Sequence, residues 1–584
     1  MTEDGLPATS SQAAIDAAYT EWVREHDRFG PAERAAVLAG VARLVEPPTI
    51  AVLLAPGFST AGRFDETLRS LRGQLYPHWD LCLAGPPPPG IGAMFKADPR
   101  VRLLGGGPYP DEAAAANAAL ADVESPYVVL LTEGDQLAPS ALYDIAAVLT
   151  EHPDTELLYT DEDLIDAAGV RSSPRLKTGW DPDLLLSHDY IGGLAVYRAR
   201  SVAAVGGWRA GFGGATGYDL ALRATGLMLP DRIRHLPAIL RHRPAAAARG
   251  TLRDRTLGPD ALAARKAVQD LLGPDIAVLP APLLPSSNRV VWPLPERAPM
   301  VSVIMPTRDL PWLLGPAAWG VVTRTDYPAF ELLIVDNDSH EEATAVALRD
   351  LAAHPRVRVL RHPGPFNFSA IANAAVREAA GDIVVLLNND VDVISPGWMR
   401  ELASQAMRPD VGAVGARLLY PDGRLQHGGV VLGPGLNATH VLRLSERNDP
   451  GYGGELAVTR SFSVVTAACL AIRKSVFLEV GGLDETNLAV AFNDVDLCLR
   501  LGEYGYRVIC TPFAELFHLE SQTRGQPDTP EKLERELREV NYLWRAWRHA
   551  FDIDPFHNPN LACAWNEPLH LCPPRRPQPW RRAV

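Results

Sequence analysis

The sequence predicts an α/β protein with two tandem domains, each built on a mainly parallel sheet, and with helices at both ends of the chain. The length of 584 residues is too great for one ordinary core. Patterns typical of strands and helices alternate over residues 46–245 and again over residues 297–525, and such alternation favours parallel sheets with helices on both faces. The second region also repeats the sequence of the first at an offset of about 250 residues, which indicates tandem domains.

Residues 1–45 are predicted to form a helical extension. Helical spacing places four apolar side chains on one of its faces: Ile15, Tyr19, Trp22 and Val23. The strand "TIAVLLAP" then opens the first domain, residues 46–245. Residues 246–296 are rich in Ala and Arg and then in Pro, which indicates a helix followed by an extended linker.

The strand "MVSVIMP" opens the second domain, residues 297–525. Residues 526–584 are predicted to form a C-terminal helix and a basic tail. Thr529 as N-cap and Pro530 at the first helical position mark the start of that helix. It is expected to dock through one stripe of apolar side chains: Leu533, Leu537, Val540, Trp544 and Trp547.

The composition argues against nucleic acid as a partner, because a net charge of −14 provides no basic footprint for phosphates. The six cysteines have no metal-type spacing and are interpreted as reduced thiols of a cytoplasmic protein. The polar N-terminus does not resemble a signal peptide, and no apolar run approaches the roughly 20 residues of a membrane helix. The basic end, "PPRRPQPWRRAV", is most simply a solvated tail, although peripheral association with the inner face of the membrane is an alternative.

The repeat allows the two domains to be compared position by position. "YPHWDLCLAG" at 76–85 matches "YPAFELLIVD" at 327–336, and "YDLALR" matches "VDLCLR". The hydrophobic frame is kept, but polar residues at the ends of elements differ. The second domain has Asp336, Asn388, Asn389, Asp390, Asn493 and Asp494 where the first has Gly85, Thr132, Glu133, Gly134, Thr216 and Gly217. The acids that disappear together are therefore predicted to be functional, and the first domain is interpreted as a degenerate copy.

Ligands of open α/β sheets bind beyond the carboxyl ends of the strands, where this polar cluster is expected. Asp390, together with Asp392 or Asn388, offers hard oxygen atoms that suit Mg²⁺ or Mn²⁺ and suit zinc poorly. Such an ion would hold a diphosphate and neutralise charge as that group departs.

At these motifs the sequence resembles the inverting nucleotide-sugar glycosyltransferases of family 2, which have the GT-A fold. It is most similar to tandem-domain members that build O-antigen, rhamnan and other surface polysaccharides. The resemblance covers nearly all of residues 299–525 and is carried by seven motifs: "VSVIMPTRD", "LLIVDNDS", "LLNNDVDV", "YPDGRLQHGGVVLG", "VTAACLAIRKSVFLEVGGLDE", "AFNDVDLCLRLGEYGYRV" and "TPFAELFHLES".

The resemblance implies a role for each matching residue. Asp494 matches the catalytic base. The donor-binding positions are Pro306, Thr307, Asp336, Asn388 and Asn389, and the metal-binding positions are Asp390, Asp392 and His518. Asn388 replaces the first acid of the family's DxD signature, and the QxxRW motif of processive synthases is absent after Asp494. The implied donor is a UDP- or dTDP-linked sugar, and the implied acceptor is a glycan or lipid-linked glycan.

Other interpretations stay open at this point. Both domains could be inactive glycan-binding modules of a scaffold, or both could be active. No complete GxGxxG follows a strand and no GxxxxGK[ST] occurs, so NAD and ATP enzymes are disfavoured. The acidic stretch "YTDEDLID" could form a second ion site, although helix capping and solvation explain it at least as well.

Several polar residues of the second domain have simpler explanations. Asp496 has a counterpart in the first domain and is interpreted as structural, pairing with Arg500. His518 has an apparent counterpart in His242, so the comparison between domains does not by itself favour a role for it. Two further histidines, His427 and His440, are interpreted as solvated surface residues of a loop on the acceptor side.

Overall fold

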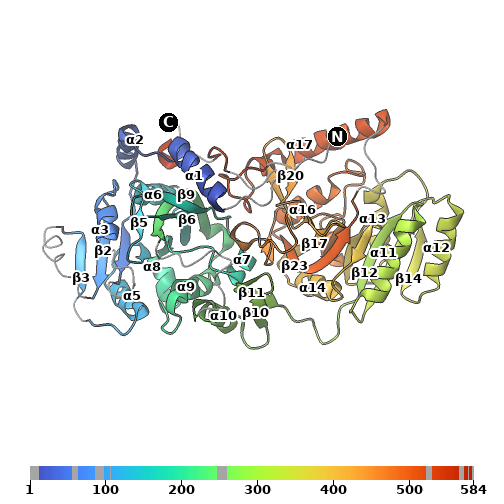
Figure 1. Ribbon diagram of the computed structural model, residues 1–584, viewed down its shortest axis with the longest axis horizontal. Coiled ribbons are helices and arrows are strands. Elements are labelled where there is room, and N and C mark those ends of the chain that lie inside the picture. Colours follow the sequence, from blue (N-terminus) through green and yellow to red (C-terminus); the bar gives the residue numbers. More distant parts are fainter. Residues whose placement is uncertain are drawn as a thin grey trace. The chain divides into compact units, whose positions relative to one another are not determined.

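The computed structural model describes residues 12–55, 64–85, 98–104, 107–245, 259–520, 529–563, 571–575 and 578–581 (Figure 1). The chain divides into two compact units. The first contains residues 1–290, 557–562 and 569–584, and the second contains residues 291–556 and 563–568. None of the described helices is long and apolar enough to cross a membrane.

The first unit is built on one large sheet with the strand order β3-β2-β1-β4-β8-β6-β9-β5 and with β7 beside β6. Its strands are β1 (Ile50–Leu54), β2 (Trp79–Ala84), β3 (Val101–Leu104), β4 (Tyr127–Leu131), β5 (Gln136–Leu137), β6 (Leu157–Ile165), β7 (Arg171–Arg175), β8 (Ala195–Arg198) and β9 (Ile233–Pro244). Its helices are α1 (Gln12–His26), α2 (Pro31–Val41), α3 (Phe64–Arg72), α5 (Glu112–Ala121), α6 (Ala141–Glu151), α7 (Pro182–Ser187), α8 (Ala199–Ala204), α9 (Thr216–Thr225) and α10 (Pro259–Leu272).

The large sheet of the second unit has the order β14-β13-β12-β15-β22-β17-β23-β16. Its strands are β12 (Val301–Thr307), β13 (Phe330–Asp336), β14 (Val357–Arg361), β15 (Ile383–Leu387), β16 (Val391–Val393), β17 (Val411–Leu419), β22 (Cys469–Arg473) and β23 (Arg507–His518), with β18 (Leu425–His427) and β21 (Arg460–Ser461) paired at β17 and β23. A separate hairpin contains β19 (Val430–Gly433) and β20 (Asn437–His440). The helices are α11 (Pro311–Arg324), α12 (Glu342–Ala352), α13 (Phe368–Glu378), α14 (Trp398–Ala406), α15 (Lys474–Glu479), α16 (Asn493–Glu503) and α17 (Pro530–Asp552).

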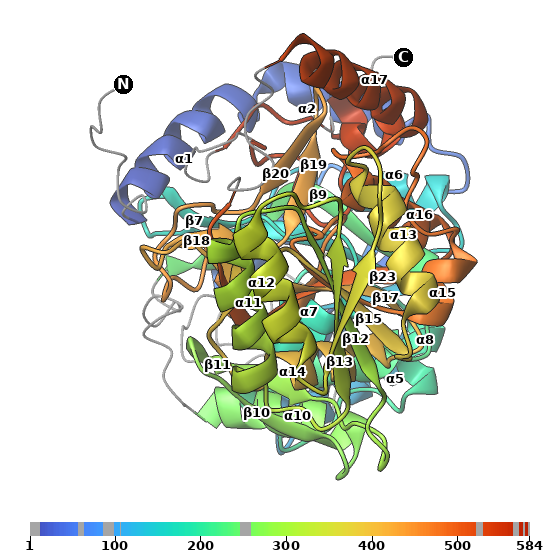
Figure 2. The same ribbon diagram turned by 90° about the vertical axis from the view of Figure 1, so that its right-hand side faces the viewer.

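Strand for strand, the two orders are the same, which confirms the predicted repeat and the α/β fold class. In the second unit α11, α12 and α14 pack on one face of the sheet. Helices α13, α15, α16 and α17 pack on the other face. Figure 2 shows α11 and α12 on one side of β12 and β13, and α13 and α15 on the other. The central strands read as unbroken apolar runs because both of their faces are buried.

Two sequence predictions about the flanking segments were wrong. The Pro-rich part of residues 246–296 is not simply an extended linker, because it forms a hairpin of β10 (Ala277–Ala281) and β11 (Leu284–Val291). Helix α17 does not dock through its predicted stripe. Of that stripe, Trp547 is buried and Val540 half-buried, but Leu533, Leu537 and Trp544 are exposed. The buried face contains Glu539, Leu543, Trp547 and Phe551.

Candidate active site

The site begins where three neighbouring parallel strands end. Thr307 and Asp336 are register partners at the ends of β12 and β13. Asn389 follows β15, and its amide Nδ2 donates a hydrogen bond of 3.0 Å to the Thr307 hydroxyl. All three side chains are buried. Pro306 lies one residue earlier on β12, opposite Val335.

A short antiparallel pairing brings Asp390 to His518. Strand β16 pairs with β23 so that Val391 is opposite His518, and the Leu519 amide donates to the Asp390 carbonyl at 3.0 Å. As a result, His518 Nε2 lies 3.3 Å from Asp390 Oδ1, and both side chains are at least nine-tenths buried. Asn388 joins this group, since its Nδ2 lies 3.4 Å from His518 Nε2.

Asp494 lies in the first turn of α16 and connects to the same group through residues 467–468. The backbone amide of Ala467 donates to Asp494 Oδ2 at 3.1 Å. The backbone carbonyl of the next residue, Ala468, accepts from the backbone amide of Asn388 at 3.1 Å. The Asp494 side chain is only half-buried. A carboxylate that is anchored by an amide and still reaches solvent can take a proton from a ligand.

The donor set around Asp390 fits a hard divalent cation. Asp390 Oδ1 and His518 Nδ1 are buried atoms without a hydrogen-bond partner among the described residues. Those residues contain no cluster of three His, Cys, Asp or Glu side chains placed to hold a metal. Two protein ligands are few for a structural metal, but Mg²⁺ and Mn²⁺ in phosphoryl sites take most of their ligands from the substrate and water.

Asp392 is not brought into this group. Its side chain forms an ion pair with Arg324 of α11 at the surface, whereas Asp390, which precedes β16, is buried beside His518. Of the three predicted metal-binding residues, the structure therefore brings together Asp390 and His518 and does not bring Asp392 to them.

An Asp390→Asn variant therefore tests the metal set against a matched control. We expect activation by Mn²⁺ to require roughly 100-fold more metal, since even outer-shell partners of a metal contribute 10- to 100-fold to its affinity. Asp392→Asn should leave the metal dependence unchanged because that carboxylate pairs with Arg324. Titration of activity with MnCl₂ measures both, and an equal response of the two variants would contradict the assignment.

Two histidines that the sequence analysis placed in solvent are instead part of the interior. His427 is fully buried and its Nδ1 lies 2.8 Å from Nδ1 of the half-buried His440. Burial, together with the nearby Arg443 and His518, lowers the pKa of His440 to about 4 even though Glu520 acts in the opposite direction. Burial likewise holds the pKa of His427 well below its usual range, so both rings are neutral at pH 7. Their spacing in the sequence gave no signal for this contact.

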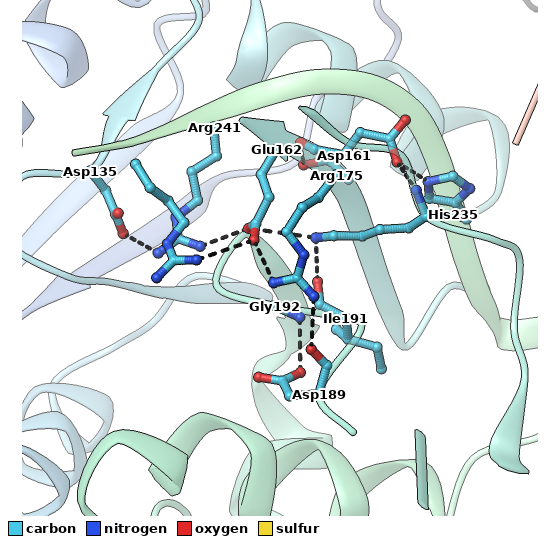
Figure 3. Close-up of polar contacts among 12 residues, drawn as sticks. Asp135, Asp161, Glu162, Arg175, Asp189, Ile191, Gly192, His235 and Arg241 are labelled. Carbon is cyan, nitrogen blue, oxygen red and sulfur yellow. Dashed lines mark hydrogen bonds and ion pairs between the residues drawn. The ribbon is translucent and has the colours of Figure 1, made fainter. Parts of the chain in front are cut away.

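In the first unit an ion-pair network occupies the corresponding sheet edge. Figure 3 shows Arg241 between Asp135 and Glu162, with Arg175 on the other side of Glu162. Arg241 donates to both acids at 2.8 Å. A Cβ atom added at Gly193 would lie 2.4 Å from the Arg241 guanidinium, so this glycine provides the space for it.

The network replaces an apolar pair of the second unit. Glu162 of β6 is the ladder partner of Arg241 of β9. At the same positions the matching strands of the second unit, β17 and β23, pair two fully buried leucines, Leu418 and Leu516. The stretch "YTDEDLID" is therefore neither a helix cap nor a solvated loop. Three of its four acids lie on β6 and are buried, and each of these has a basic partner within the same unit: His235 for Asp161, Arg241 for Glu162 and His242 for Asp163. The fourth acid, Asp166, is exposed in the turn after β6.

The strand register also corrects the counterpart of His518. In the first unit, Gln136 lies five residues beyond the end of β4 and is the ladder partner of His242. In the second unit, Asp392 lies five residues beyond the end of β15 and is the ladder partner of Phe517, so His242 corresponds to Phe517. The position of His518 therefore corresponds to Arg243. A cation replaces the histidine in the first unit, so His518 now belongs with the residues that the two units do not share.

Comparisons with known proteins match this chain most clearly in its second unit. Residues 302–481 match the model of glycosyl transferase family 2. The chain is 40% identical over 90% of its length to the uncharacterized protein y4gI of Sinorhizobium fredii and 36% identical over 93% to the O-antigen biosynthesis protein RfbC of Myxococcus xanthus. It spans only 59% and 42% of the length of these two relatives.

Two shorter similarities also involve transferases. An N-acetylglucosaminyl-diphospho-decaprenol L-rhamnosyltransferase of Mycobacterium tuberculosis is 29% identical over 38% of this chain and 75% of its own length. Among solved structures, the mannosyltransferase PcManGT of Pyrobaculum calidifontis, in complex with GDP-Man and Mn²⁺, aligns at a TM-score of 0.31 and 18% identity over 44% of this chain and 67% of its own.

Proposed function

The chain belongs to glycosyl transferase family 2 through its second unit, and from that premise we propose that it transfers a sugar from a nucleotide-diphosphate donor to a glycan or lipid-linked glycan acceptor, with inversion at the anomeric carbon. One observation carries the proposal. A continuous set of contacts at one sheet edge joins the residue pairs Thr307–Asn389, Asn388–His518 and His518–Asp390, and residues 467–468 link this set to Asp494.

In this proposal the strand ends bind the donor. Asp336 and Thr307 hold the nucleoside, with Pro306, Asn388 and Asn389 lining the same edge. Asp390 and His518 would hold Mg²⁺ or Mn²⁺, which supplies charge neutralisation for the leaving diphosphate. The neutral pair His427–His440 lies near His518 and adds no positive charge that would repel the metal.

Asp494 is the proposed general base. A sugar hydroxyl is a weak nucleophile, so a carboxylate must accept its proton while the bond to the anomeric carbon forms. The Ala467 amide holds one oxygen of Asp494 in place and its half-exposed position leaves it accessible to an acceptor. Attack from the side opposite the diphosphate inverts the anomeric carbon. Without the QxxRW motif after Asp494, we propose that one or a few sugars are added per encounter.

The proposed context is the assembly of a surface polysaccharide at the cytoplasmic side of the membrane. The Myxococcus xanthus relative is named an O-antigen biosynthesis protein, which supports the polysaccharide part of this proposal. The first unit is proposed to be inactive, because glycines replace the acids and the Glu162–Arg241 network fills its sheet edge. A scaffold in which both units only recognise glycans is the alternative.

Release of nucleoside diphosphate from a panel of UDP- and dTDP-linked sugars separates these two functions. We expect release from one donor, dependent on Mn²⁺ or Mg²⁺ and stimulated by a glycan acceptor. No release from any donor, combined with binding of glycans, would favour the scaffold. Proton NMR of the product would show the inverted anomeric configuration.

A further inference from the structure

Helix α17 docks on the second unit with a face that includes a buried carboxylate, Glu539. This side chain is 3% exposed, whereas Leu533 and Leu537 of the same helix are 50% and 54% exposed. Burying a carboxylate is unfavourable unless it is hydrogen-bonded. The docked face therefore combines apolar packing by Leu543, Trp547 and Phe551 with a carboxylate whose burial requires hydrogen-bond donors.

Both oxygens of Glu539 accept hydrogen bonds from the loop that leads to Asp494. Oε1 accepts from the Val490 amide at 3.0 Å and Oε2 from the Ala491 amide at 2.9 Å. The next residue, Phe492, has a φ of +60°, a left-handed conformation that is unfavourable for a phenylalanine. A bidentate carboxylate on two successive amides fixes the peptide planes immediately before this strained residue.

The same helix also holds the chain just beyond Asp494. Trp547 Nε1 donates to Asp496 Oδ1 at 2.9 Å, and the other oxygen of Asp496 accepts from Arg500 at 2.8 Å. Helix α17 thus contacts the chain three residues before Asp494 and two residues after it. Asp494 lies between these two attachments, and its two oxygens accept from the Ala467 and Val495 amides.

The first unit provides an internal comparison. Asp219 of the first unit corresponds to Asp496 of the second, so Gly214, five residues before Asp219, corresponds to Ala491. The Gly214 amide donates to Asp260 of α10 at 3.2 Å. That single hydrogen bond is exposed, and the helix that follows has Gly217 at the position of Asp494. The loop before the proposed base, Asp494, is thus held by two buried hydrogen bonds in the second unit. The matching loop of the first unit, which has no such carboxylate, is held by one exposed hydrogen bond.

We propose that Glu539 is a positioning residue, which holds residues 490–493 so that Asp494 meets the acceptor hydroxyl. This inference rests on the proposed role of Asp494 as base. Glu539 lies outside the stretch that matches the family model, residues 302–481. Because a misplacement of about 1 Å can lower a rate roughly 100-fold, loss of this contact should reduce turnover far more than donor binding.

The test compares Glu539→Ala with Glu534→Ala, which removes an exposed carboxylate of the same helix that pairs with Arg538. We expect Glu539→Ala to lower kcat roughly 10- to 100-fold with unchanged donor affinity. Hydrogen exchange at the Val490 and Ala491 amides should accelerate, while the β15 amides keep their protection. Glu534→Ala should change neither quantity. Glu539→Gln should recover part of kcat, because its amide oxygen can accept one of the two hydrogen bonds.

Unchanged kcat in Glu539→Ala, or equal losses of kcat and donor affinity, would overturn the inference. Slow exchange at Val490 and Ala491 in that variant would overturn it as well. If Asp494→Asn itself remained active, the proposed base would be wrong. The exchange measurement would still show whether Glu539 orders the loop, so the two failures are distinguishable.

Discussion

Replacing Asp494 by asparagine should lower kcat about 100- to 10,000-fold, the range that a positioned general base contributes to a proton transfer. Such a loss corresponds to about 3–5 kcal/mol of transition-state stabilisation. Asparagine has nearly the same shape, and its single side-chain oxygen can still accept from one of the two amides, of Ala467 or Val495, that contact the carboxylate. Steady-state assays of nucleoside diphosphate release measure kcat, and calorimetric titration with the donor should show unchanged affinity.

The control for this variant is Asp422→Asn, which removes an exposed carboxylate of the same unit that pairs with Arg424. It should retain full activity. Near-normal turnover of Asp494→Asn would eliminate the proposed mechanism. A parallel loss of donor affinity and kcat would instead place Asp494 in donor binding.

A Glu162→Gln substitution should destabilise the first unit by about 3–5 kcal/mol, as expected when one partner of a buried ion pair is removed. Burial opposes ionisation of Glu162, but Lys177, Arg241, Arg175 and Arg243 together outweigh it and hold the pKa of Glu162 well below its usual range. Without that charge, the fully buried Arg241 and its neighbours retain only partial compensation from Asp135.

Hydrogen exchange of the β6 and β9 amides reports on this unit separately from the second. Asp154→Asn is the matched control, because Asp154 is half-exposed and pairs with Arg234 at 3.4 Å, so its effect should stay below about 1 kcal/mol. Unchanged protection in Glu162→Gln would show that the network does not stabilise the unit.

The pH dependence of the first unit follows from the same carboxylate. Since the folded pKa of Glu162 is depressed, its stabilising contribution is fully present above the unfolded value, near pH 4.3–4.5. It is lost progressively as the pH falls from there toward the folded value. The β6 and β9 amides of the unsubstituted protein should therefore lose protection below about pH 4.5, and in Glu162→Gln this part of the acid dependence should disappear.

The sequence by itself determined the α/β class, the tandem repeat and the polar residues that lie together at one edge of the second sheet. Short unbroken apolar runs rich in β-branched residues, such as "IVVLL", favour strands buried on both faces, and polar residues directly after such a strand lie where the sheet ends. Because parallel strands end at one edge, residues separated in the sequence, such as Thr307 and Asn389, were expected to meet there, and they do. The internal repeat identified Asp336, Asp390 and Asp494 as the residues that distinguish the two units.

Only the tertiary structure decided which polar groups face each other. Asp392 pairs with Arg324 at the surface, whereas Asp390 lies beside His518, and the β5–β9 register makes Arg243, not His242, the counterpart of His518. Helix α17 docks through Leu543, Trp547 and Phe551, together with a buried Glu539 that accepts two hydrogen bonds, and not through Leu533, Leu537 and Trp544. Periodicity encodes which side of an element is apolar, whereas the partner of a buried charge depends on contacts between segments far apart in the chain, and such contacts exist only once the fold has formed.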